Sequence, residues 1–202
     1  LMNMHKTDRM HYLTSMQTDA FIGTQIYQKV MQTPCSFFAN GDQTSTTIRT
    51  LKGKTILIQH NVMSPRPYNR MFQVIGTQGY AAKYPTPEIM LSRESAAKVG
   101  IDIDENSVLL SASQIETLLH SYAPDFRPET INLAKQLDPR GGMSYFMDLR
   151  LAHCLQQGLP LDMDVYDLAE WCSIAELSKL SIEHGSMPVL IPDFTRGAGF
   201  VK

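Results

Sequence analysis

Residues 54–70 read KTILIQHNVMSPRPYNR, a stretch in which a regular strand pattern gives way to a proline-rich loop. Side chains of a β-strand point alternately to the two faces of a sheet. This alternation puts four residues of the first part on one side, namely Ile56, Ile58, His60 and Val62. The pattern predicts a strand over residues 54–63 that carries apolar side chains toward a core.

The loop that follows is stiffened by Pro65 and Pro67. Each proline fixes φ and removes a backbone donor, so a central strand cannot continue through them. A rigid loop at the end of a strand can hold side chains still in front of a ligand. The groups on offer are cationic, aromatic and hydroxyl-bearing, without a carboxylate: His60, Arg66, Tyr68 and Arg70. This set suits a polar or anionic ligand such as a sugar or a phosphate. The structural alternative is that the arginines pair with distant acids and that Tyr68 caps the core.

Neighbouring segments supply further strands joined by short turns. Strand patterns occur at residues 11–17, 45–51, 71–76 and 79–84. Lys52 and Gly53 form a two-residue connection typical of a tight hairpin, and a second hairpin is predicted around Gly79. Short connections favour antiparallel pairing, so the sheet should be largely antiparallel.

The last third of the chain has helical periodicity. We predict helices there at residues 129–137, 143–157 and 164–184, and two further helices earlier in the chain at 18–31 and 113–122. Gly158 can end the helix before it, and Asp164 with Asp167 can form a capping box. The apolar residues of the last helix are spread so widely that we expect it between the sheet and another helix. Strands first and helices last predict an α+β fold: an open, mostly antiparallel (mixed) β-sheet with helices on one face.

Two stretches have weaker patterns. Residues 85–125 contain prolines and an acidic run, and we expect an excursion packed on the sheet edge whose role stays open. Residues 1–10 are polar and basic and predict a connection from a preceding segment.

Composition excludes several classes of function. The chain has 202 residues, 43% of them hydrophobic, which is enough for a substantial core and predicts one domain. A net charge of -2 gives no electrostatic footprint for nucleic acid, and no apolar run is long enough for a bilayer. No signal peptide is visible, and with Leu1 as the first residue a periplasmic or secreted bacterial origin and a cytoplasmic one both stay open.

The chain lacks the usual sequence marks of a catalytic or cofactor site. It contains no GxGxxG after a strand, no P-loop, no HExxH and no GxSxG. Cys35, Cys154 and Cys172 lack metal-type spacing and are interpreted as buried thiols. Asp148, Arg150 and His153 are charged neighbours in sequence, but their spacing puts them on different helix faces and predicts surface pairs. We therefore assign no catalytic, cofactor-binding or metal-binding residue within the chain.

Three segments resemble a known family when taken in order: HNVMSPRPYNR at 60–70, GLPLDMDVYDLAEWCSIAELS at 158–178 and MPVLIPDFTRG at 187–197. They closely resemble the C-terminal region of family 109 glycoside hydrolases, which are NAD-dependent α-N-acetylgalactosaminidases of the Gfo/Idh/MocA oxidoreductase superfamily. The resemblance covers nearly the whole chain. It implies a C-terminal substrate-binding and oligomerisation domain that follows an N-terminal Rossmann domain, which holds the NAD.

The resemblance also implies an unusual chemistry. NAD takes a hydride from C3 of the sugar, the ketone acidifies the C2 proton, and elimination, water addition and hydride return complete the cycle. No pair of catalytic carboxylates is then needed, because the cofactor performs the difficult steps. The implied substrate is a terminal α-N-acetylgalactosaminide, and the isolated domain should be inactive.

Carried over by position, Tyr68 matches a family tyrosine that contacts the sugar. Arg66 and His60, from the same stretch, complete the substrate-binding candidates. Two departures concern activity: Asn61 stands where the family usually has Asp, and Arg140 precedes Gly-Gly where the family usually has His. The family's Tyr-Pro-Thr-His-Gly segment, which supplies catalytic and cofactor contacts, would lie before Leu1.

Three hypotheses follow. The chain is a domain of an NAD-dependent glycosidase, a domain of a sugar dehydrogenase with the same fold, or a non-catalytic module that mainly dimerises. In each case we expect a homo-oligomer through the open sheet face, because the strand at 54–63 has apolar residues on both faces.

Overall fold

The computed structural model describes residues 7–34, 38–122, 128–138 and 141–198. The chain divides into two compact units, which are described separately below. The first unit comprises Leu1–Arg66 and Pro160–Lys202, and the second comprises Pro67–Leu159. Both units hold an antiparallel sheet and helices, which confirms the α+β class.

The sheet of the first unit has the strand order β3-β2-β1-β8. Its strands are β1 (Met10–Gln17), β2 (Thr44–Thr50), β3 (Thr55–His60) and β8 (Val189–Leu190). The predicted β2–β3 hairpin is confirmed: Gly53 has φ +81° in the turn, and its N–H donates to the Thr50 carbonyl at 3.0 Å. A residue with a Cβ avoids that conformation, so glycine is the favoured residue at the turn.

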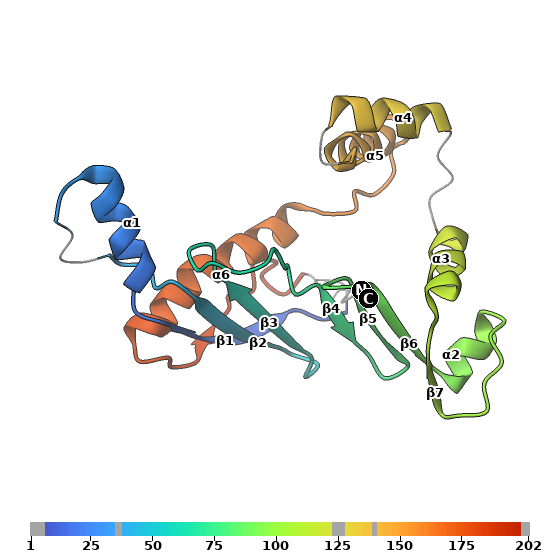
Figure 1. Ribbon diagram of the computed structural model, residues 1–202, viewed down its shortest axis with the longest axis horizontal. Helices are drawn as coiled ribbons and strands as arrows, with labels where there is room; N and C mark the ends of the chain where they lie inside the picture. Colours follow the sequence, from blue (N-terminus) through green and yellow to red (C-terminus); the bar gives the residue numbers. More distant parts are fainter. Residues whose placement is uncertain (1–6, 35–37, 123–127, 139–140, 199–202) are drawn as a thin grey trace. The chain divides into compact units, whose positions relative to one another are not determined.

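Helix α6 (Val165–Glu183) covers one face of this sheet (Figure 1). The register aligns Leu13, Ile48 and Ile56 across three strands, and Ile174 and Leu177 of α6 pack on them. The predicted capping box is present, because the Asp164 carboxylate accepts from the Asp167 N–H at 3.0 Å and the Asp167 side chain accepts in return.

The outer side of α6 differs from the expectation. The sequence predicts a second helix over this side, but the principal packing of α6 in the described residues is against β1 and β8. Leu168 and Trp171 are therefore exposed. Cys172 is also exposed, which corrects its interpretation as a buried thiol, whereas Cys154 is buried as predicted. The reason is that an apolar helix pattern shows which side chains could be covered but not what covers them.

Helix α1 (Phe21–Met31) extends from the end of β1 in Figure 1. Its N-terminus is held by a residue from a distant turn: the Asp42 carboxylate accepts the backbone N–H groups of Ile22 and Gly23 at 2.8 and 2.9 Å. Such bonds satisfy donors that the first helical turn leaves unpaired. The turn at Gly41 and Asp42 therefore helps to fix the start of α1.

The second unit contains a four-stranded meander in which each strand pairs with the next. The strands are β4 (Gln73–Ile75), β5 (Gly79–Ala82), β6 (Glu88–Ser92) and β7 (Ser107–Leu109). The helices are α2 (Arg93–Lys98), α3 (Ala112–Ser121), α4 (Pro128–Leu137) and α5 (Met143–Gln157). Gly158 ends α5 in the left-handed conformation, as predicted.

Two expectations about architecture are corrected. The strands form two four-stranded sheets where a single open sheet was expected. Residues 85–125, expected to form an excursion on the sheet edge, supply β6, α2 and β7 as well as the predicted α3. These strands have three to five residues, too few for alternation to be visible in the sequence.

Some expectations fall outside the described residues, among them those for residues 1–6, Cys35 and Arg140. Within the described part of the chain, no helix combines the length and apolar character that a membrane crossing requires.

Candidate functional site

The end of strand β3 is fixed by the side chain of Asn61. Its amide donates to Gln43 Oε1 at 3.2 Å and to Ser64 Oγ at 3.1 Å, while its carbonyl oxygen accepts the Ser64 N–H at 3.0 Å. An aspartate could accept the last bond but could not donate to Gln43. Asn61 therefore holds the turn that leads into the proline loop.

The three substrate-binding candidates are divided between the two units. His60 ends β3 and Arg66 lies in the loop, so both belong to the first unit, and both are exposed. Tyr68 follows Pro67, the first residue of the second unit, and therefore belongs to that unit.

Tyr68 is surrounded by groups that orient it while leaving it accessible. Its side chain is 70% exposed, so it does not cap a core in this structure. Its hydroxyl accepts a hydrogen bond from Arg70 Nε. Its ring meets that of Tyr84 edge to face, with centroids 5.9 Å apart and planes at 81°. The hydroxyl, which can both donate and accept, is thus presented on a ring held from two sides.

The β4–β5 hairpin explains why Tyr84 reaches Tyr68. Gln73 pairs with Ala82, and the Lys83 N–H donates to the Phe72 carbonyl at 2.9 Å, so the segments before β4 and after β5 run side by side. Lys83 also places its ammonium 5.9 Å from the Tyr84 ring centroid, and Arg70 Cζ lies 5.6 Å from that of Tyr68. We call Tyr68, Arg70, Lys83 and Tyr84 the tyrosine cluster.

Two members of the tyrosine cluster, Lys83 and Tyr84, are absent from the sequence-based candidates. The hairpin around Gly79 is predicted, but its register is needed to place Lys83 opposite Phe72. A Tyr-Pro pair at the end of the strand predicted over residues 79–84 is the one local signal that could have drawn attention to Tyr84.

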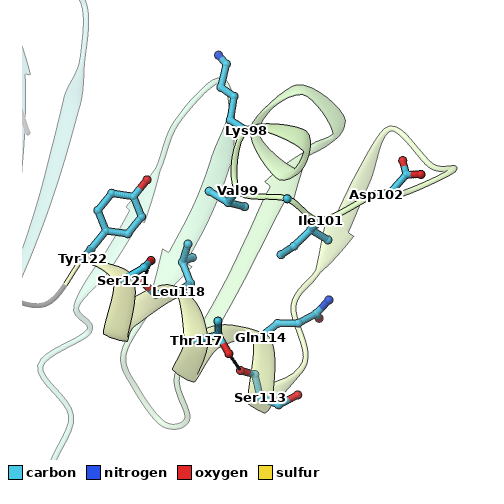
Figure 2. A pocket seen from close by; sticks show the side chains of 11 residues that line it. Lys98, Val99, Ile101, Asp102, Ser113, Gln114, Thr117, Leu118, Ser121 and Tyr122 are labelled. Carbon is cyan, nitrogen blue, oxygen red and sulfur yellow. Dashed lines mark hydrogen bonds between the residues drawn. The ribbon is translucent and has the colours of Figure 1, made fainter.

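A separate pocket of about 910 Å³ lies in the second unit beside α3, shown in Figure 2. Three hydroxyl residues one helical turn apart line its α3 side: Ser113, Thr117 and Ser121. Figure 2 shows Lys98 extending away from α3, and its ammonium pairs with Glu94 at 2.7 Å. The lining residues include no histidine or cysteine, and the ionisable side chains among them are those of Lys98, Asp102 and Tyr122.

Two buried carboxylates have structural partners in the first unit. The side chain of Asp8 accepts from one ammonium, one hydroxyl and two backbone amides, those of Lys54, Thr50, Arg9 and Lys52. Burial acts to raise the pKa of Asp8, but these bonds, led by that from Lys54, outweigh it and hold the pKa below its usual value. On α6, Glu170 Oε1 accepts the Met10 N–H at 2.7 Å and ties the helix to β1.

The charged residues of α5, predicted to form surface pairs and not a catalytic cluster, lie at the surface. Asp148, Arg150 and His153 on α5 are all exposed. In the parts of the chain that the structure describes, no three His, Cys, Asp or Glu residues are arranged to hold a metal ion.

Comparison with known proteins gives a consistent family. Residues 1–200 match the family described as "Glycosyl hydrolase 109, C-terminal domain". A glycosyl hydrolase family 109 protein of Bacteroides fragilis is 50% identical over 203 residues, which cover 98% of this chain and 43% of the relative. Family 109 proteins of Bacteroides thetaiotaomicron and Porphyromonas gingivalis are each 48% identical, again over 98% of this chain and 43% of theirs. The chain thus spans less than half the length of these relatives.

Proposed function

This chain belongs to the glycosyl hydrolase 109 family as its C-terminal domain, and from this we propose that it forms the substrate-side domain of an NAD-dependent glycosidase. The proposed substrate is a terminal α-linked N-acetylgalactosamine, released through oxidation and elimination. The family match supports the glycosidase class, and the sugar and the cofactor are parts of the proposal.

The residues of this chain do not by themselves fit a dinucleotide. A dinucleotide needs a glycine-rich turn that lets its pyrophosphate approach a helix N-terminus. Among the described residues, the helices that follow strands are preceded by Ala20, Ser92 and Ser111, and no glycine lies in these junctions. We therefore assign NAD to a Rossmann domain in the remaining length of such a protein.

The observation that carries the proposal for this chain is the accessible, oriented hydroxyl of Tyr68. A sugar contact needs an accessible polar group from which a ligand can displace water, and the exposed Tyr68 hydroxyl is such a group. Tyr84 and Arg70 restrict its ring, so little side-chain freedom is lost when the sugar binds. His60 and Arg66 remain candidates for further polar contacts.

The test uses the longer protein that contains this chain and an aryl α-N-acetylgalactosaminide. A glycosidase releases the free aryl alcohol with no net NADH. A sugar dehydrogenase, the second hypothesis, would instead produce NADH in step with substrate consumption. Release of neither product, together with no sugar affinity that depends on Tyr68, would favour the third hypothesis, a dimerisation module.

A further inference from the structure

We propose that the tyrosine cluster binds an acidic sugar, that is, a sugar unit carrying a sulfate ester or a carboxylate. This proposal rests on the proposed function, since it describes the class of glycan that the substrate-side domain would accept. It goes further because it assigns roles to Arg70, Lys83 and Tyr84.

In the tyrosine cluster the two aromatic rings contact each other, and each ring has one cation beside it. Arg70 lies against Tyr68, Tyr68 meets Tyr84 edge to face, and Lys83 lies against Tyr84. Aromatic rings provide the apolar surfaces that line ligand sites, and a few placed polar groups fix the orientation of the ligand. A sugar ring packed on the tyrosines would therefore have a cation within reach of its charged substituent.

The two cations of the tyrosine cluster, Arg70 and Lys83, have no counter-ion among the described residues of their own unit. Among the described residues of the second unit, no carboxylate lies within ion-pair distance of Arg70 or Lys83. Lys98 of the same unit shows the contrast, because Glu94 neutralises it at 2.7 Å. A ligand oxyanion would supply the missing partner.

The hydrogen bond to Tyr68 prepares the Arg70 guanidinium for this role. Only Nε is used by the tyrosine hydroxyl, so the two terminal NH₂ groups remain available as donors. The planar guanidinium matches the paired oxygens of a carboxylate or a sulfate. Lys83 adds a second positive charge beside Tyr84, which can attract a further oxyanion of the ligand.

The charge of the whole chain favours a small acidic ligand over a polyanion. The net charge is -2, and two cations do not form the extended basic surface that nucleic acid requires. Sulfate esters and uronic acids both present oxyanions. Probes that carry one or both of these groups show which of the two the cluster binds.

The experiment measures binding to this 202-residue chain by titration calorimetry at low salt. The probes are N-acetylgalactosamine, which is neutral, an unsulfated chondroitin disaccharide, which has a carboxylate, and its 4-sulfated form. We expect at least one acidic probe to bind about tenfold more tightly than the neutral sugar, since one charge-assisted bond of about 1.5 kcal/mol gives this factor. The preference should shrink at higher salt, because the cluster is exposed.

Matched variants locate the effect. Arg70→Gln should lower the affinity for the acidic probe about tenfold. It should lower the affinity for the neutral sugar by a smaller factor, because the variant also loses the hydrogen bond that orients the Tyr68 hydroxyl. Lys83→Gln should cause a smaller loss of the acidic preference. Arg93→Gln changes another exposed arginine of the same unit and should alter nothing. Equal affinity for neutral and acidic probes would overturn the proposal, as would an equal loss in the Arg70 and Arg93 variants.

This outcome is separable from that of the proposed function. Binding is measured without NAD and without turnover, so loss of the acidic preference would leave the glycosidase assignment standing. Conversely, a longer protein that fails to cleave the aryl substrate would not alter the binding result for the tyrosine cluster.

Discussion

At the scale of the residue, variants of Tyr68 show whether this side chain contacts the ligand or only stabilises the fold. Tyr68→Phe in the longer protein removes one hydroxyl. We expect kcat/KM for an aryl N-acetylgalactosaminide to fall, because transition-state stabilisation decreases by about 0.5–1.5 kcal/mol. Because the side chain is 70% exposed, Tyr68→Ala should change the free energy of unfolding by only about 0.5 kcal/mol. The measurements are steady-state kinetics and thermal melting of both variants. An unchanged kcat/KM for the Phe variant would remove Tyr68 from the substrate contacts.

The lowered pKa of Asp8, another feature at the residue scale, predicts that the stability of the fold decreases in acid. Its pKa is lowered in the folded chain, so its contribution to stability is complete above the unfolded-state pKa of about 3.9 and is lost as pH falls through the folded-state value. We expect Asp8→Asn to cost about 1–3 kcal/mol at pH 7, because the ammonium of Lys54, 2.8 Å away, loses its charged partner.

The difference between wild type and Asp8→Asn should narrow when urea unfolding is repeated below about pH 4. Asp104→Asn, at an exposed position of the second unit, serves as the control and should track wild type at every pH. A gap that stays constant with pH would show that the Asp8 charge is not what stabilises the fold.

At the scale of the element, the start of α1 depends on a glycine. A Cβ added to Gly41 would lie 2.0 Å from the Thr18 carbonyl oxygen, so backbone would have to move. We expect Gly41→Ala to destabilise the chain by about 1–3 kcal/mol. It should also speed amide exchange at Ile22 and Gly23, whose N–H groups the neighbouring Asp42 accepts.

Gly76→Ala is the matched control, since its Cβ would meet the Gly79 carbonyl oxygen at 3.6 Å, an ordinary contact. It should change stability by no more than about 0.5 kcal/mol. Similar losses for both glycines would mean that the close approach at Gly41 is not the cause. Chemical denaturation and hydrogen exchange give the two readouts.

The same scale shows what the sequence could predict. Helix α5 spans the predicted residues, and α6 differs by one residue at each end, because both carry caps and many turns of periodicity. Strand β8 has two residues and pairs with β1 from a distance of more than 170 residues in sequence, so no local pattern marks it. The tyrosine cluster follows the same rule: the Tyr68 loop is readable as a rigid polar segment, whereas Lys83 and Tyr84 reach it only through hairpin register.

At the scale of the whole molecule, the first prediction concerns NAD. We expect this chain alone to bind NAD no more tightly than millimolar and to hydrolyse no glycoside, because the strand-to-helix junctions that the structure describes lack the glycines of a pyrophosphate cradle. Titration calorimetry with NAD tests this, with the longer protein as the positive control. Micromolar binding to these 202 residues would overturn the assignment of the cofactor to another domain.

Assembly is the second prediction at this scale. Helix α6 covers one face of the first sheet, and the register puts Leu57 and Leu190 on the other face, where they are 60% and 68% exposed. Apolar side chains on an uncovered sheet face are stabilised when a second surface removes them from water. We therefore expect two copies to associate through this face, and light scattering at increasing concentration should show a dimer or a higher assembly.

The location of that contact can be tested with two leucines of similar exposure. Leu57→Lys puts a charge into the proposed contact and should shift the chain toward monomer, because burying an unpaired ammonium costs more than association returns. Leu155→Lys alters α5, where the leucine is 66% exposed, and should leave assembly unchanged. A strict monomer at high concentration in wild type, or equal dissociation by both variants, would place any association outside the open face of the first sheet.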